Sequence, residues 1–233
     1  MRFAVLLVAS ALLAGCAGCA AGGDSHPTKL TPITPTPTFR TSTTKSAPAT
    51  STSTAPATVA PGVGATEAEA IEWVEAAPPV DAAEFHVGLR NGTSTPLGED
   101  VAFNTPSGTT CMTDVQRSPK NLACLVNLSD PPAQPSDVYG AWKGGWVDFN
   151  GGSVEVGSAH GDPGPFAAGQ GMPLPEGKSL AFGDFRCRND MTALVCVNYP
   201  KQSAVRFSDA GIDPYDCARR MPPTTGIGIQ YTC

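Results

Sequence analysis

The sequence predicts a mainly β domain: a small disulfide-stapled barrel or sandwich with one short N-terminal helix. Short apolar or β-branched runs recur from residue 84 onward, and Gly, Pro, Asn and Asp separate them, as is typical of strands joined by turns. Six cysteines accompany these runs, and a helix-capping pattern precedes them. The chain before this domain has a different composition and is considered first.

The N-terminus predicts export and lipidation. A basic start precedes an apolar run from Phe3 to Leu13, which has the length of a signal-peptide core and is too short to span a bilayer. Leu13-Ala14-Gly15-Cys16 resembles the bacterial lipobox. We expect residues 1–15 to be a lipoprotein signal peptide and Cys16 to carry several acyl chains such as palmitate, because one chain alone binds membranes only marginally. Cys19 is a poorer acceptor, since Cys16 stands where an aliphatic residue is expected.

Residues 16–65 are predicted to form a lipidated N-terminus followed by a disordered stalk. The stretch from Pro27 to Pro61 is dominated by Thr, Ser and Pro and holds almost no large apolar residue. Such a chain cannot offset the entropy of ordering it, and prolines favour an extended conformation. Its Thr-Pro pairs are also typical of O-glycosylated stalks, although an unmodified spacer fits the composition as well.

Charge excludes one class of partner. From Glu67 to the end, 20 acidic residues stand against 11 basic ones, which gives this domain a net charge of −9. Nucleic-acid binding needs clustered Lys and Arg, so we expect no nucleic-acid partner. An acidic surface usually serves solubility, although it can also attract a cationic partner.

A capping box predicts where the domain's helix begins. Thr66 is followed three residues later by Glu69, so each side chain can bond the backbone N–H of the other. Apolar residues continue at helical spacing as far as Ala76, and Pro78-Pro79 ends the pattern. We therefore assign residues 66–233 to a single β-rich domain that starts with this helix.

The expected strands follow the helix, and Asn91-Gly92 is typical of a two-residue hairpin turn. The runs are Glu84 to Leu89, Val101 to Phe103, Thr109 to Met112, Leu122 to Leu128, Gly145 to Phe149, Ser153 to Val156, Leu180 to Cys187, Ala193 to Asn198 and Ala204 to Phe207.

An even number of domain cysteines in an exported chain argues for disulfides. We expect neighbours to pair, because two pairs sit in strand-like runs on either side of a polar turn. Zinc is the alternative, but the domain cysteines form no close Cys-x-x-Cys or Cys/His cluster, so no metal or other cofactor is expected. The predicted disulfides are Cys111–Cys124, Cys187–Cys196 and Cys217–Cys233.

A resemblance to a known family rests on residues 103–111 (FNTPSGTTC), on Cys124, and on the later segments 183–187 (GDFRC) and 196–198 (CVN). These segments resemble actinobacterial secreted domains with a Phe-x-x-Pro-Ser-Gly-Asn-Ile-x-Cys signature. The wider layout looks like mycobacterial lipoproteins of the LppI type. The sequence departs from the signature at Thr109-Thr110 and in a Gly/Pro-rich insert from Gly151 to Pro175. The resemblance implies the address and the fold, and it supplies no catalytic residues.

The search for catalytic patterns assigns none. Ser158, His160 and Asp162 share one loop, but residues two apart rarely meet as a triad. Ser107 lies between Pro106 and Gly108, which is ordinary turn chemistry. A hydrolase acting on envelope material through Ser158 and His160, or through Ser107, is the alternative function.

Four aromatic residues form a candidate ligand platform: Tyr139, Trp142, Trp146 and Phe149. Aromatic faces beside glycines can bind sugars, whereas filling the core is their other role. A binding site should leave two of the rings partly exposed in a concave patch.

We expect a non-enzymatic lipoprotein on the extracytoplasmic face of the cell membrane, held there by its lipid. Its domain would act as a structural module or bind an envelope glycan, a small ligand or a protein.

Overall fold

The computed structural model describes residues 57–215 and 219–232, which belong to one compact unit. The predicted signal peptide, Cys16, most of the predicted stalk, Cys217 and Cys233 lie outside the described residues. The described elements are one α-helix, α1, followed by strands joined through turns and three short 3-10 helices. The 3-10 helices are η1 (Ala82–Phe85), η2 (Gly164–Ala168) and η3 (Tyr199–Lys201).

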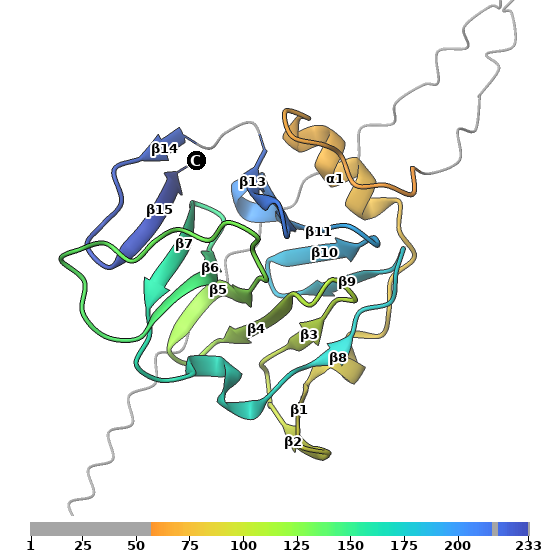
Figure 1. The fold of residues 1–233 in the computed structure, drawn as a ribbon. Coiled ribbons are helices and arrows are strands. Elements are labelled where there is room, and N and C mark those ends of the chain that lie inside the picture. Colours follow the sequence, from red (N-terminus) through yellow and green to blue (C-terminus); the bar gives the residue numbers. More distant parts are fainter. Residues whose placement is uncertain (1–56, 216–218, 233) are drawn as a thin grey trace, which may run out of the picture. The chain divides into compact units, whose positions relative to one another are not determined.

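Eight strands form the larger sheet, and they follow one another across Figure 1. Neighbouring strands are antiparallel except β3 and β8, which are parallel. In spatial order the strands are β14 (Arg219–Met221), β15 (Ile227–Thr232), β7 (Ser153–Ala159), β6 (Trp142–Phe149), β5 (Ser118–Leu125), β4 (Thr110–Asp114), β3 (Ala102–Asn104) and β8 (Met172–Pro173).

Five strands form the second sheet, which is wholly antiparallel. A separate hairpin of β1 (Val87–Arg90) and β2 (Thr93–Pro96) turns at Asn91-Gly92, where both residues have positive φ, as the sequence predicts. In spatial order the five strands are β13 (Gly211–Pro214), β12 (Ser203–Ser208), β11 (Leu194–Asn198), β10 (Phe185–Asn189) and β9 (Ser179–Phe182).

The main core lies between the two sheets, where their inner faces share one cluster of buried apolar residues. Four phenylalanine rings join the sheets. Phe103 of the larger sheet lies 5.8 Å from Phe182, and Phe149 lies 5.6 Å from Phe185, measured between ring centroids. Phe182 and Phe185 are stacked on each other at 5.7 Å. The sheets do not close on themselves, so the predicted fold class is confirmed as a sandwich with one helix and not as a barrel.

Two disulfides staple hairpins from the inside of this core. Cys111 and Cys124 are directly opposite on β4 and β5, and Cys187 and Cys196 are directly opposite on β10 and β11. All four cysteines are buried. The structure thus contains two of the three predicted pairs, and the third pair stays a prediction.

Helix α1 (Glu67–Glu75) forms a further layer on the outer face of the five-stranded sheet, beside β11 in Figure 1. Thr66 and Glu69 make the reciprocal capping box that the sequence predicts. Because β11 is covered on both faces, its residues alternate between the two cores: Leu194 and Cys196 face the other sheet, whereas Val195 and Val197 face the helix. This explains why its sequence is apolar without interruption.

The predicted end of the stalk is too late in the sequence. The composition predicts that residues 57–65 belong to the stalk, but they pack beside α1, where Ala60 is buried. The backbone N–H of Ala60 donates to Asp190 at 2.6 Å, and the Tyr215 hydroxyl donates to the Pro61 carbonyl at 2.8 Å. Burial raises the pKa of Tyr215 to about 12. Residues 57–65 therefore belong to the domain, because buried partners satisfy polar groups of this segment.

Two predicted strands were placed too coarsely. The run from Leu180 to Cys187 is two strands, because Gly183 takes a positive φ and makes a tight turn between β9 and β10 with Asp184. The run from Glu84 to Leu89 begins as 3-10 helix η1, in which the Asp81 side chain accepts from the Ala83 N–H, and only the end of the run is strand.

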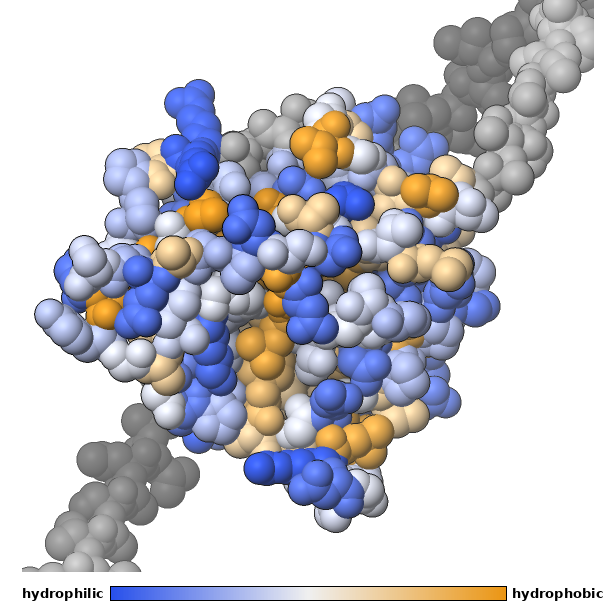
Figure 2. Space-filling model, viewed as in Figure 1, coloured by the Kyte–Doolittle hydropathy of each residue, from blue (hydrophilic) through white to orange (hydrophobic). Residues whose placement is uncertain are grey.

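On the face drawn in Figure 2, hydrophobic side chains are scattered among hydrophilic ones, which is ordinary for a surface exposed to water.

Candidate functional site

The four aromatic residues of the predicted platform do not share a surface. Phe149 is fully buried between the sheets, and Trp146 lies on the opposite face of β6. Trp142 is half-buried and donates its indole N–H to the Pro132 carbonyl at 2.9 Å. Tyr139 is 88% exposed. The prediction that the four aromatic side chains form one ligand-binding surface is therefore wrong, since successive strand residues point to opposite sides of a sheet.

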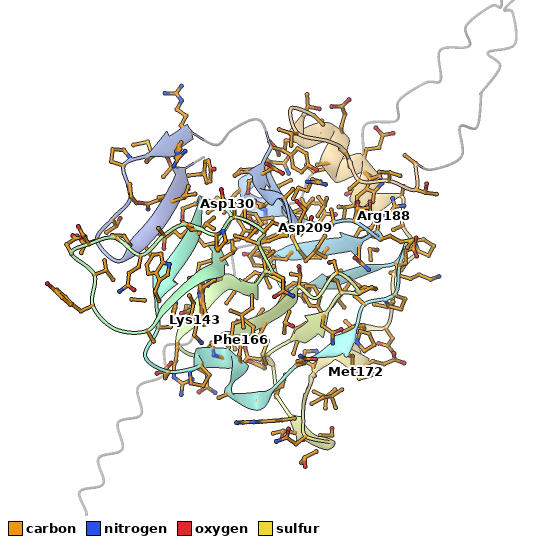
Figure 3. The ribbon with its side chains drawn as sticks, viewed as in Figure 1. Asp130, Lys143, Phe166, Met172, Arg188 and Asp209 are labelled. Atoms are coloured by element: carbon orange, nitrogen blue, oxygen red, sulfur yellow. A yellow bond between two sulfur atoms is a disulfide. The ribbon has the colours of Figure 1, made fainter. Side chains whose placement is uncertain are left out.

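Trp146 does mark a site, on the outer face of the eight-stranded sheet. The His160 ring is stacked on its indole with 3.5 Å between ring centroids, and Phe166 of η2 meets it edge-on at 5.1 Å. The ammonium of Lys143 lies 5.4 Å from the indole centroid. Figure 3 labels Lys143 and Phe166, which come from β6 and from η2. The segment 160–168 thus covers this part of the sheet and leaves Trp146 only 3% exposed.

A row of polar residues crosses the same face beside Trp146. The backbone register places Asp148 of β6 opposite Glu155 of β7, and Glu155 opposite Gln230 of β15. On its other side Asp148 is opposite the small side chain of Ala123 on β5. Two carboxylates are therefore direct neighbours across adjacent strands. Like charges in that position destabilise a sheet unless another group compensates for them.

Hydrogen bonds hold both carboxylates in place. Asp148 accepts from the Asn121 amide at 2.6 Å on one oxygen and from the Trp146 indole N–H at 2.8 Å on the other. Glu155 accepts from the Gln230 amide at 3.1 Å. These donors are neutral, so they orient the carboxylates without cancelling their charge.

The titratable groups of the site respond to this environment. Burial raises the pKa of Glu155, and the negative charge of Asp148 raises that pKa further. Burial lowers the pKa of His160. Lys143 lowers the His160 pKa as well, whereas Asp148 and Asp162 oppose the shift. At neutral pH the His160 ring is therefore uncharged, and the negative charge of the carboxylate pair has no cationic partner in these contacts.

These residues line an open pocket of about 410 Å³. We call it the carboxylate pocket. Its floor is the outer face of β5, β6 and β7, and its rim includes the β4–β5 turn and η2. Arg117 stands at the rim, where it pairs with Asp114 at 3.0 Å and is largely exposed. The lining residues are Asp114, Arg117, Ser118, Pro119, Asn121, Ala123, Trp146, Asp148, Asn150, Ser153, Glu155, His160, Gly164 and Pro165.

The serines of the alternative hydrolase do not meet His160. The Ser158 hydroxyl is buried and has no hydrogen-bond partner within the described residues. Ser107 lies 2.8 Å from the Thr105 hydroxyl, in a turn that Gly108 closes with a positive φ. The His160 ring is stacked on Trp146 instead. Within residues 57–215 and 219–232, neither predicted nucleophile is hydrogen-bonded to a base, and acyl-transfer catalysis of this type requires that contact.

Sequence reasoning missed the two carboxylates at the centre of the pocket. The alternation Trp146-x-Asp148 on one strand and Ser153-x-Glu155 on the next was the available signal, because alternate residues share a face.

Among residues 57–215 and 219–232, no group of three or more His, Cys, Asp or Glu side chains is placed to hold a metal ion. No helix in the same ranges is both long and apolar enough to cross a bilayer.

Comparison with known proteins adds no relative: no family model, curated protein or solved structure matches this chain. The geometry of the carboxylate pocket therefore stands by itself as the basis for a functional proposal.

Proposed function

We propose that the protein is a cell-envelope lipoprotein, anchored through Cys16, whose β domain binds a polar ligand in the carboxylate pocket without catalysing a reaction. The observation that carries the proposal is the Asp148–Glu155 pair, two neighbouring carboxylates held open to a pocket by neutral donors. The lipobox-like sequence before Cys16 supports the address.

The lining favours a ligand that carries an amine among hydroxyl groups. An ammonium group would relieve the repulsion between Asp148 and Glu155, and a charge-assisted hydrogen bond is stronger than a neutral one. Asn121, Asn150 and Ser153 add amide and hydroxyl groups of the kind that bind sugar hydroxyls. Anionic ligands would be repelled by the same carboxylates. Amino sugars of envelope polymers have the required chemistry.

Binding of two matched probes to the purified full-length chain tests this proposal. We expect the glucosamine trimer to bind, and the N-acetylglucosamine trimer, which has the same length but lacks the ammonium groups, to bind at least about tenfold more weakly by calorimetry, a difference of about 1.4 kcal/mol. Equal affinity for the two trimers would show that the carboxylates do not select the ligand.

Two charge-removing variants locate the binding. Glu155→Gln should weaken binding of the glucosamine trimer about tenfold, because it keeps the shape of the side chain and removes one carboxylate. Glu176→Gln makes the same change at an exposed position outside the pocket and should leave the affinity unchanged. An equal loss in both variants would assign the binding to overall charge and would overturn the pocket as the site.

A further inference from the structure

A second pocket opens at one end of the sandwich, between the two sheets. It has a volume of about 300 Å³. We call it the inter-sheet pocket. One wall is the segment 99–101 with the end of β4, the second is the start of β5, and the third is the turn between β9 and β10. The lining residues are Glu99, Val101, Thr113, Val115, Pro119, Lys120, Asn121, Phe182, Gly183, Asp184 and Phe185.

The inner part of this pocket is apolar. Phe182 and Phe185 are opposite each other across the β9–β10 turn, and their stacked rings reach the rings of Phe103 and Phe149 in the core. Val101, which is 3% exposed, contributes to the wall from the other sheet. A ligand entering here would therefore contact the same apolar layer that holds the sandwich together.

Hydrogen bonds fix the wall opposite the two phenylalanines. The Thr113 hydroxyl donates to Asp100 at 3.0 Å and accepts from the Val101 N–H at 2.9 Å. The Val115 N–H donates to the same Asp100 oxygen at 2.7 Å. These bonds satisfy the local polar groups, so the apolar side chains of Val101 and Val115 are left to line the pocket.

The rim of the pocket carries charge of the wrong sign for an anion. The Lys120 ammonium lies 4.0 Å from Asp184, which neutralises it across the gap between the sheets. Glu99 adds a negative charge at the same rim. The net negative charge of this rim would repel a fatty-acid carboxylate, whereas it would not repel an uncharged hydroxyl or ester group.

We propose that the inter-sheet pocket binds a neutral alkyl chain. A cavity of about 150 Å³ holds one benzene molecule, so a pocket of twice that volume takes about ten to twelve carbon atoms. The chain would lie against Phe182 and Phe185 with its uncharged end at the Lys120–Asp184 pair. Both a medium-length alcohol and the tail of an uncharged ester have this chemistry. The inference does not rest on the proposed function, although Pro119 and Asn121 line both pockets.

The first test uses the unmodified full-length chain with 1-decanol and decanoate, which have the same number of carbons. We expect 1-decanol to bind at least about fivefold more tightly than decanoate at neutral pH. Its titration should shift the NMR methyl signals of Val101 and Val115 before others. Tighter binding of decanoate, or methyl shifts confined to other valines, would overturn the proposal.

A blocking variant with a matched control provides the second test. Val115→Trp should fill the mouth and weaken 1-decanol binding at least about tenfold, since the side chain is 36% exposed and tolerates a larger group. Leu89→Trp changes an equally exposed residue of β1, outside the pocket, and should bind 1-decanol normally. Undiminished binding by Val115→Trp would assign the alcohol to a different site. If either variant unfolds, the methyl shifts of the unmodified chain decide the question.

Discussion

Glu155 is the residue through which pH should control the carboxylate pocket. Its pKa is raised by burial and by Asp148, so a proton removes its charge at a higher pH than for a free glutamate. Only the ionised form attracts an ammonium group. As long as the amines of the glucosamine trimer stay protonated, its affinity should thus fall as the pH falls through the raised pKa of Glu155.

His160 acts in the same direction. Its pKa is lowered by burial, so it becomes positively charged only at lower pH and then repels the ammonium group. Calorimetry from about pH 4 to 8 measures the profile. Glu155→Gln should remove the first part of the pH dependence, whereas Glu176→Gln should keep it. An unchanged profile in Glu155→Gln would contradict the assignment.

Arg188 joins the N-terminal segment to the fold. It is 4% exposed, its guanidinium lies 3.9 Å from the Trp73 ring centroid, and it donates to the carbonyls of Trp73 and Ala57. Figure 3 labels Arg188, which lies on β10 beside α1. Because the cation is buried, its two bonds contribute strongly to holding Ala57 and α1 on the sheet.

Arg188→Met should lower the free energy of unfolding by about 2 to 4 kcal/mol, because it leaves two carbonyls without their charged donor. Urea unfolding measures this change. Arg219→Met removes the same charge from an exposed residue of β14 and should change the stability by less than about 0.5 kcal/mol. A loss of similar size in both variants would show that net charge, and not the buried contacts, is responsible.

At the scale of single residues, the sequence predicted the two cysteine pairs that the structure contains, whereas the four aromatic residues of the predicted platform do not share a surface. The partner of a cysteine can be predicted when a short polar turn separates two cysteines in neighbouring strands, as at Cys187 and Cys196. Aromatic residues carry no such information: Trp146 and Phe149 are three apart, and in a strand an odd spacing places them on opposite faces.

Among the elements, the two stapled hairpins should contribute strongly to stability. Replacing both Cys187 and Cys196 by Ala should lower the free energy of unfolding by about 3 kcal/mol, since the link closes a short loop in the unfolded chain. Urea unfolding of the double variant measures the loss. The corresponding change at Cys111 and Cys124 should cost a similar amount, because its loop is only slightly longer.

The strand register should survive this double substitution. Neighbouring strands on both sides continue to hold β10 and β11, so circular dichroism of the folded variant should match the unmodified chain. Loss of the strand signal under native conditions would mean that the disulfide is needed to form the hairpin and does more than stabilise it.

Elements with local signals could be predicted, and elements that depend on distant partners could not. Helix α1 begins at its capping box, and the β1–β2 turn follows from Asn91-Gly92. Strand β15 alternates Ile227, Ile229 and Tyr231 with Gly, Gln and Thr, which is a local signal that the prediction did not use. Strands β8 and β13 each end in proline and β14 is exposed throughout, so neither composition nor alternation marked these three strands. They are strands because other strands pair with them.

For the whole molecule, the anchor remains the prediction that decides the address. Cys16→Ala should abolish incorporation of a labelled fatty acid, because Cys19 lacks the aliphatic residue three positions before it. The protein should then move from the membrane to the soluble fraction, since each buried CH₂ of the acyl chains contributes about 0.8 kcal/mol. Full labelling of the variant would show that Cys19 accepts the lipid. Membrane retention without label would point to a different attachment.

The contacts of residues 57–61 also determine how the domain would respond to mechanical tension. A pull on the chain before Ala57 would first break the bonds that the Ala57 carbonyl accepts from Trp73 and Arg188. The bond between Ala60 and Asp190 and the bond between Tyr215 and Pro61 would follow. The load would thus reach the capped start of α1 only after these bonds had parted one at a time. Until then the bonds would pass the load to β10 through Arg188 and to α1 through Trp73, and the segment could return to its place when the pull ended.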